Sequence, residues 1–148
     1  MAQLWHTGRV GHSVDRNGKL PFAPSPLPIR GMQQFTSQGK KDYEVPQEMT
    51  IQEIKQTITD IGQAAKNAIA AGFDGVQLHS ANAYLPNQFL AESANQRTDD
   101  FGGSIPNNSR LVLELMQELI SFVGGEKVGI KISPFNPFAF CFVGKLWC

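Results

Sequence analysis

Apolar residues recur along this chain with two periods, which predict helices separated by short strands. Between residues 51 and 69 they return every three or four positions, as on one face of an amphipathic helix. Thr50 and Glu53 have the spacing of a capping box, in which a hydroxyl and a carboxylate satisfy free amides at a helix start. Gly72 follows as the expected carboxyl-terminal stop.

A second helix is predicted after the turn-forming residues 99–104. Ser104 and Pro106 suit a helix start, because proline is well tolerated in the first turn. Apolar residues from Leu111 to Val123 then form one helical face, and two glycines end the helix. This part of the chain therefore predicts a turn followed by an amphipathic helix.

Three short apolar segments are predicted strands, at Ala2–Trp5, Val76–His79 and Val128–Pro134. In the last, Val128, Ile130 and Ile132 alternate with Gly129, Lys131 and Ser133, so the strand has two different faces. Strands that alternate with single helices indicate an α/β fold with a parallel sheet. Because three such strands cannot cover their own edges, we expect this chain to be part of a larger α/β barrel.

The remaining segments are expected to be loops or a separate tail. Residues 13–45 carry several prolines and little periodicity, which predicts a long irregular excursion. Residues 86–97 are expected to be irregular or briefly helical. We divide the chain into a barrel part, 1–137, and an atypical tail, 138–148, whose aromatic and cysteine residues suggest a truncation or frameshift.

Composition excludes several classes of function. The 148 residues carry no net charge and no basic stripe, so nucleic-acid binding is not expected. The sequence shows no signal peptide and no apolar run long enough for a membrane span, and it predicts a cytoplasmic protein without a membrane partner. Cys141 and Cys148 have neither disulfide-framework nor metal-ligand spacing, and we expect no metal site.

The candidate chemistry follows the second predicted strand, at the end where parallel α/β folds hold ligands. His79 and Asn82 could stabilise negative charge on a carbonyl oxygen. A phenol, with an ordinary pKa near 10, suits a general acid, which makes Tyr84 a candidate proton donor. From spacing alone the structural alternative is favoured: His79 caps the strand, Asn82 forms a turn and Tyr84 packs.

Further polar residues have two readings each. Lys131 could meet an anionic or electron-rich cofactor edge inside a barrel, or be a solvated lysine on an edge strand. Gln3 could bond a flat heterocycle, although such amides more often satisfy backbone groups. For Arg97, Asp99 and Asp100 we favour ion pairing and capping over a paired-carboxylate hydrolase.

Several ordered motifs together carry a resemblance to a known family. They are Gln3–Arg9, Ala64–Ala68 with Gly72–Val76, His79–Leu85 with Asn87–Leu90, and Asn95–Ile105. In this order they closely resemble the Old Yellow Enzyme family of flavin-dependent ene-reductases, over nearly all of residues 2–137. The resemblance implies a (β/α)8 TIM barrel, of which about three of eight strands are present.

The resemblance also implies an activity and its residues. Enzymes of this family bind FMN, take hydride from NADPH or NADH and deliver it to the β-carbon of an activated alkene. His79 and Asn82 would hold the carbonyl oxygen of a small enone, and Tyr84 would protonate the α-carbon. Gln3 would contact the flavin ring, and Trp5 would pack near the site.

Two departures from the family pattern affect the cofactor. Lys131 stands where many relatives have arginine, so the positive charge is kept without the bidentate fork. The family also uses earlier strands for part of the flavin-ring site and late strands for the phosphate, and neither set is expected in this sequence. We therefore expect this chain by itself to bind FMN weakly.

Two other functions remain open at this stage. The chain could be a non-catalytic remnant of such a barrel that acts only as an interaction or self-associating module. A phosphate-binding barrel enzyme such as an aldolase is less favoured, because no lysine pairs with His79 in a Schiff-base pattern. The sequence does not indicate an oligomeric state.

Overall fold

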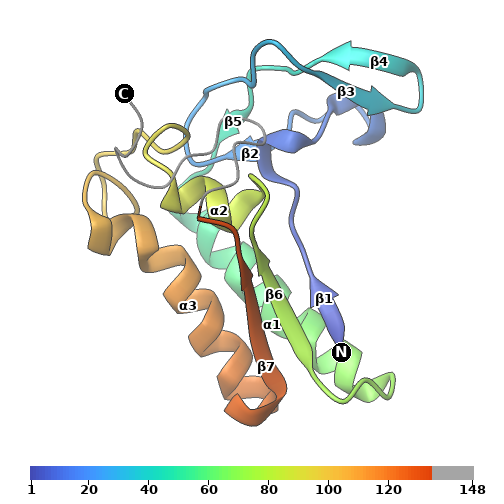
Figure 1. Cartoon of the computed structure of the whole chain (residues 1–148), viewed down its shortest axis with the longest axis vertical. Helices are drawn as coiled ribbons and strands as arrows, with labels where there is room; N and C mark the ends of the chain where they lie inside the picture. The colour runs from blue at the N-terminus through green and yellow to red at the C-terminus, as the bar shows by residue number, and fades with distance from the viewer. Residues whose placement is uncertain (135–148) are drawn as a thin grey trace.

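The computed structural model describes residues 1–134. Its centre is a three-stranded parallel sheet. Strands β1 (Ala2–Leu4), β6 (Val76–Ser80) and β7 (Val128–Ile132) lie in the order β1-β6-β7. Helices α1 (Ile51–Ala70) and α3 (Ile105–Val123) each connect one of these strands to the next and pack side by side (Figure 1). The structure therefore has the predicted alternation of strand and helix.

Both long helices begin and end where the sequence predicts. The Thr50 hydroxyl accepts from the amide of Glu53 at 3.2 Å, and the Glu53 carboxylate accepts from the amide of Thr50 at 2.8 Å. Ser104 caps α3 with a single hydrogen bond, in which its hydroxyl oxygen accepts from the amide of Asn107 at 3.3 Å. Gly72 and Gly124 follow the two helices with φ of 91° and 86°, a left-handed backbone that favours glycine.

The main core lies between the helices and one face of the sheet. Leu4, Val76 and Leu78 point to this side because alternate residues of a strand face opposite ways. Their partners from the two helices include Ile54, Ile61, Ala65, Leu111, Leu115 and Leu119, all buried. Each large side chain buried here stabilises the fold by about 1.5–3 kcal/mol. Most polar residues of these strands lie on the other face.

Strand register brings those polar residues into rows on the second face, which we call the polar face. Gln3 pairs with Gln77, and His79 pairs with Lys131. Register partners in parallel strands point the same way, so the face consists of Gln3, Gln77, His79, Gly129 and Lys131. On the other face, Ile130 and Ile132 of the edge strand β7 are 39% and 61% exposed. Such an apolar edge is characteristic of part of a barrel.

The prediction of an irregular excursion over residues 13–45 is wrong in one respect. Strands β3 (Gln33–Thr36) and β4 (Gly39–Asp42) form an antiparallel hairpin that projects from the body (Figure 1). Gly39, with φ of 93°, makes its turn possible. The hairpin sequence is almost wholly polar, so it lacks the apolar alternation by which strands are recognised.

The remaining elements are short. Strands β2 (Phe22–Ala23) and β5 (Gln47–Glu48) pair in parallel, and α2 (Leu85–Leu90) is the brief helix expected within residues 86–97. Single 3-10 turns occupy Gly8–Val10, Ser13–Asp15 and Gly125–Lys127. The tail predicted at 138–148, with both cysteines, lies outside the described residues.

Candidate functional site

His79 lies near the carboxyl end of β6 as a buried and neutral hydrogen-bond donor. Its side chain is on the polar face, and the residue is only 5% exposed. Nδ1 accepts from the amide of Ala81 at 3.2 Å, so the proton of the neutral ring is on Nε2. Burial and, secondarily, the positive charge of Lys131 lower the pKa of His79 below its usual value. At neutral pH this side chain can therefore donate from Nε2 to an oxygen acceptor.

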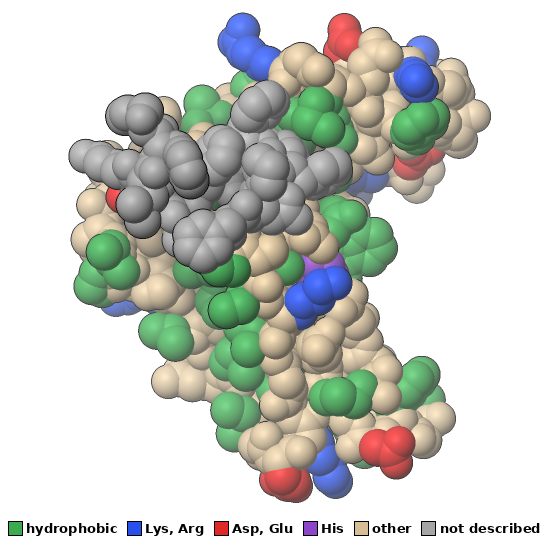
Figure 2. All heavy atoms as spheres, in the orientation of Figure 1, with side chains coloured by type: hydrophobic (Ala, Val, Ile, Leu, Met, Phe, Trp, Pro, Cys, Tyr) green, Lys and Arg blue, Asp and Glu red, His purple; other side chains and the backbone are tan. Residues whose placement is uncertain are grey.

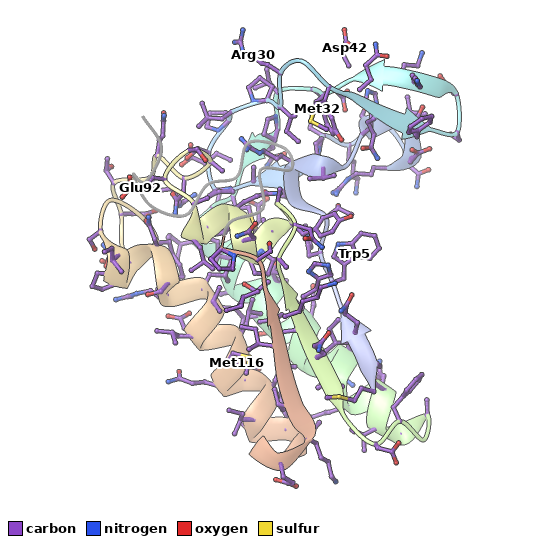
Figure 3. The ribbon with its side chains drawn as sticks, in the orientation of Figure 1. Trp5, Arg30, Met32, Asp42, Glu92 and Met116 are labelled. Carbon is purple, nitrogen blue, oxygen red and sulfur yellow. The ribbon has the colours of Figure 1, made fainter. Side chains whose placement is uncertain are left out.

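Tyr84 contacts His79 directly. The two rings meet edge to face with centroids 5.0 Å apart and planes at 90°. On its other side Tyr84 meets Trp5, also at 5.0 Å, and Figure 3 shows Trp5 beyond the end of β1. Edge-to-face pairs of this kind orient rings as well as stabilise them. The phenol is thus held beside the imidazole, in a row of three aromatic rings.

Asn82 lies between His79 and Tyr84 in the sequence, in an unusual turn. Asn82 and Ala83 have φ of 55° and 62°, so two consecutive non-glycine residues adopt the left-handed conformation. The amide of Asn82 donates to Oγ of Ser133 at 2.7 Å, and that of Ala83 donates to Oδ1 of Asn87 at 2.8 Å. The structural role predicted for Asn82, a turn, is therefore present, and its role toward a substrate stays a prediction.

The two predicted cofactor residues also lie on the polar face. Lys131 stands next to His79 across the β6–β7 pairing and is exposed, which is the solvated edge-strand position; its role toward a cofactor stays a prediction. Gln3 donates from its amide to Oε1 of Gln77 at 2.7 Å. Sequence reasoning missed Gln77, although its position two residues before His79 puts it on the same face.

The loop after β1 is fixed to this site by Gln88, another residue that the sequence did not single out. Its buried amide nitrogen donates to the carbonyl oxygens of Thr7, at 3.2 Å, and Ala83, at 2.6 Å. Its oxygen accepts from the amide of Arg9 at 3.2 Å. A side chain on Gly8 would collide with Gln88, and φ at Gly8 is 60°. Glycine at this position lets the two loops approach closely.

The charged cluster at residues 97–100 is structural, as favoured. The Arg97 guanidinium donates to both carboxylate oxygens of Asp99, with Nε to Oδ1 at 3.0 Å. The hydrogen bond from Arg97 is the main cause that lowers the pKa of Asp99. Asp100 pairs with Arg110 at 3.4 Å instead. The two carboxylates thus serve different partners, which confirms ion pairing over a shared catalytic site.

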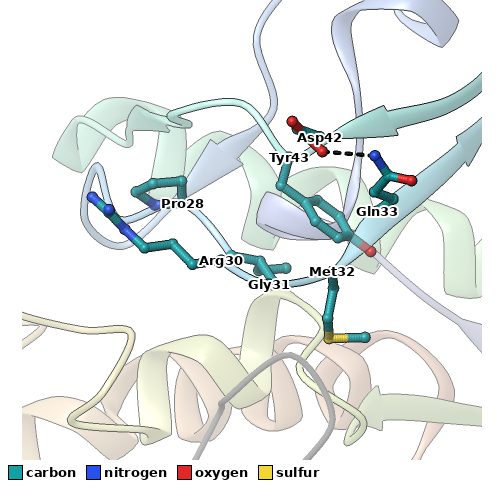
Figure 4. A pocket seen from close by; sticks show the side chains of 8 residues that line it. Pro28, Arg30, Gly31, Met32, Gln33, Asp42 and Tyr43 are labelled. Carbon is teal, nitrogen blue, oxygen red and sulfur yellow. Dashed lines mark hydrogen bonds between the residues drawn. The ribbon is translucent and has the colours of Figure 1, made fainter.

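Two pockets occur near the site without including it. One, of about 380 Å³, lies at the root of the hairpin (Figure 4). The wall of this pocket includes Tyr43, which packs in the same apolar cluster as Tyr84. A second pocket, of about 370 Å³, lies between Trp5 and helix α1. In Figure 2 hydrophobic, basic and histidine side chains meet where the molecule narrows beside the hairpin part.

Metal ions and membranes were also considered for the described part of the chain. Within residues 1–134, no group of three or more His, Cys, Asp or Glu side chains is arranged to hold a metal ion. In the same range, no helix is both long and apolar enough to cross a membrane. The cytoplasmic location stays a prediction.

Known proteins resemble this chain closely in sequence. The flavin oxidoreductase hxnT of Emericella nidulans is 45% identical over 139 residues, which is 93% of this chain and 35% of that protein. A probable flavin mononucleotide-dependent alkene reductase of Leishmania infantum is 44% identical over 92% of this chain and 39% of its own length. The chain thus spans well under half the length of these relatives.

Solved structures show the same architecture. The Old Yellow Enzyme homologue from Zymomonas mobilis superposes with a TM-score of 0.91, 37% identity, and coverage of 96% of this chain and 39% of that one. Morphinone reductase in complex with tetrahydroNAD gives a TM-score of 0.90 at 40% identity, over 97% of this chain and 41% of the other. These likenesses confirm the predicted α/β class and partial barrel.

A family model settles the relationship. The model of the NADH:flavin oxidoreductase / NADH oxidase family matches residues 1–140, nearly the whole chain. The match agrees with the ordered motifs from Gln3 to Ile105 and with the two solved folds. This chain belongs to the NADH:flavin oxidoreductase / NADH oxidase family, within which it resembles the Old Yellow Enzymes.

Proposed function

We propose that this chain supplies the substrate-binding and proton-donating part of an FMN-dependent oxidoreductase. The reaction is the NADPH- or NADH-dependent reduction of the activated C=C bond in an α,β-unsaturated carbonyl compound. One observation carries the proposal: His79, a neutral donor through Nε2, lies in ring contact with the phenol-bearing Tyr84 at the carboxyl end of β6. The alkene-reductase description of the Leishmania infantum relative supports the same reaction.

The proposed roles follow from the chemistry of each side chain. His79 Nε2 and the Asn82 amide bind the carbonyl oxygen and stabilise negative charge that develops on it. The Tyr84 hydroxyl delivers a proton to the α-carbon, because a phenol is ordinarily protonated at neutral pH. Trp5 packs against Tyr84 and shields that ring from solvent on one side. When bound, FMN supplies the hydride that NADPH or NADH provides.

The polar face has a donor set that fits the edge of a flavin ring. The Gln3 and Gln77 amides lie side by side and present both donors and acceptors. Lys131 adds a positive charge next to His79, as a point charge without a planar fork. We propose Gln3 and Lys131, with Gln77, as the residues that hold the cofactor.

Loading the chain with FMN tests the cofactor part of the proposal. The purified 148-residue chain is mixed with FMN, desalted, and examined for bound flavin absorbance and for NADPH-dependent loss of 2-cyclohexen-1-one. We expect weak flavin retention from this chain alone. Robust turnover would show that these residues suffice, against the expected weak binding.

The proton-donor role is tested in a completed barrel. Residues 1–134 replace the matching segment of the Zymomonas mobilis homologue, and Tyr84→Phe is compared with Tyr43→Phe, which removes the other phenol. We expect Tyr84→Phe to keep enone binding and to slow protonation strongly, while Tyr43→Phe changes turnover little. Equal rates for the parent and Tyr84→Phe would count against the role.

The alternative of a non-catalytic, self-associating remnant has no finding in its favour. The aldolase alternative is set aside because the family match is to flavin oxidoreductases. A defined oligomer of the chain without flavin in size-exclusion chromatography would bring the first alternative back.

A further inference from the structure

The turn that carries Asn82 into the site adopts a conformation that its own residues do not favour. Asn82 and Ala83 are both left-handed, at φ of 55° and 62°. Asparagine tolerates this conformation because its short side chain can bond locally, but alanine has a Cβ that crowds the following carbonyl oxygen. Ala83 is also only 1% exposed, so water does not supply hydrogen bonds to its backbone. Contacts from elsewhere must therefore hold the turn.

Two side chains from different elements provide those contacts. The Ser133 hydroxyl oxygen, just beyond β7, accepts from the Asn82 amide at 2.7 Å across 51 residues of sequence. Oδ1 of the buried Asn87, in α2, accepts from the Ala83 amide at 2.8 Å. Both amides point to side-chain acceptors because the left-handed turn directs them away from the usual backbone partners. The bond to Ser133 is the one that joins the segments just after β6 and β7.

Ser133 lies just beyond the end of β7 at Ile132, two residues after Lys131. Lys131 in turn is the register partner of His79. The end of β7 thus brings a cation beside His79 and a hydrogen-bond acceptor to the Asn82 amide, which links the two proposed carbonyl-binding residues through one segment.

We propose that Ser133 is a positioning residue for the substrate carbonyl. By accepting from the Asn82 amide, it holds the left-handed turn that presents Asn82 and Tyr84 on the same side as His79. Asn87 supports the turn from the other side. This inference rests on the proposed function, because it assigns Ser133 to the binding of the same enone.

The experiment uses the full 148-residue chain, labelled with ¹⁵N, and three variants. Ser133→Ala removes the acceptor, and Ser133→Thr keeps an oxygen at the same carbon. Ser121→Ala is the control, because the Ser121 hydroxyl bonds only the preceding helical turn, at Glu118. Circular dichroism and spectral dispersion establish that each variant is folded.

Two measurements are made on each folded variant. The first is hydrogen exchange at the Asn82 amide, which we expect to be faster in Ser133→Ala and restored in Ser133→Thr. The second is the binding of 2-cyclohexen-1-one, followed by the shifts of the Asn82 and His79 resonances. We expect about fivefold weaker binding in Ser133→Ala, the factor that corresponds to loss of one typical hydrogen bond. Ser121→Ala should change neither.

The outcomes separate this inference from the proposed function. If the parent chain shows no enone-induced shifts at His79 and Asn82, the proposed function fails, and the exchange data still decide whether Ser133 holds the turn. If the parent binds the enone and Ser133→Ala binds it equally well, the positioning role is overturned while the function stands. Unchanged exchange at Asn82 in Ser133→Ala overturns it in either case.

Discussion

Replacing Arg97 by methionine removes a buried guanidinium that joins several distant segments of the chain. Nη1 donates to the carbonyl oxygens of Pro24, at 3.0 Å, and of Met49, at 2.7 Å. The same group forms a two-point ion pair with Asp99. The Arg97 side chain is only 4% exposed, so water does not reach these acceptors in its place. Methionine retains much of the buried aliphatic length and isolates the loss of the charged group.

The magnitude follows from what the substitution leaves behind. Two carbonyl oxygens lose charge-assisted hydrogen bonds, each of which contributes about 1.5–3 kcal/mol. Asp99 is 39% exposed and can be hydrated, so its loss of a partner adds less than about 1 kcal/mol. We therefore expect Arg97→Met to lower the free energy of unfolding by about 3–7 kcal/mol. That is a large part of the 5–15 kcal/mol typical of a domain.

Urea unfolding followed by far-UV circular dichroism measures this change. The matched control is Arg110→Met, which breaks the 3.4 Å pair between Arg110 and Asp100, with side chains 42% and 78% exposed. An exposed pair of this kind contributes less than about 1 kcal/mol. If the two variants unfold at similar urea concentrations with similar slopes, the reasoning about Arg97 is refuted.

The same variant should also change how the free energy of unfolding falls at acid pH. The hydrogen bond from Arg97 lowers the pKa of Asp99 below 3.8, so the folded state holds this proton less tightly than the unfolded state. The pair therefore stabilises the fold above about pH 4, and this contribution is lost as the pH falls through the folded pKa. In Arg97→Met that part of the acid dependence should disappear, whereas Arg110→Met should keep it.

Three further predictions concern stability at other sites. Thr50→Ala removes the capping hydroxyl of α1 and should cost about 1 kcal/mol in urea unfolding, whereas Thr59→Ala, on the exposed side of the same helix, should cost much less. Burial is the main cause that lowers the pKa of His6 to about 4, so the unfolded state takes up this proton first and stability should fall from pH 6.5 towards pH 4. His6 Nδ1 accepts from the Gly8 amide at 3.1 Å, and the side-chain oxygen of His6→Asn can still accept this bond. In this variant the fall should be smaller by up to about 3 kcal/mol; an unchanged slope would contradict the assignment. Gly75→Ala would place a Cβ 2.6 Å from a backbone carbonyl oxygen and should lower the melting temperature by the equivalent of about 1–3 kcal/mol, while Gly125→Ala, whose Cβ meets only one methyl group at 3.9 Å, should leave it nearly unchanged.

The elements set by local interactions could be predicted from the sequence. Helix α1 was expected from its periodicity, its capping box and Gly72, and all three features act within a few residues of one another. The same holds for α3, with its cap at Ser104. The two faces of β7 followed from simple alternation, and the register confirms that Lys131 lies on the face away from the helices.

The hairpin at residues 33–42 could not be predicted in this way. Its strands are polar and depend on pairing with each other and on contacts with distant residues. The nearby loop, for example, is held where the Glu44 carboxylate accepts from the amide and the hydroxyl of Ser13, both at 2.6 Å. No periodic pattern records such a contact, because the partners are separated by 31 residues.

For the candidate site, the order of residues along the chain identifies which side chains are available, namely His79, Asn82 and Tyr84 after a strand and Lys131 within another. It leaves open whether these residues have a structural or a chemical role. The folded structure adds that His79 is buried with its proton on Nε2, that Tyr84 lies against it, and that the Asn82 amide donates to Ser133. These features depend on packing, because periodicity and capping act between neighbours along the chain, whereas burial, ring contacts and the bond to Ser133 arise when separate strands come together.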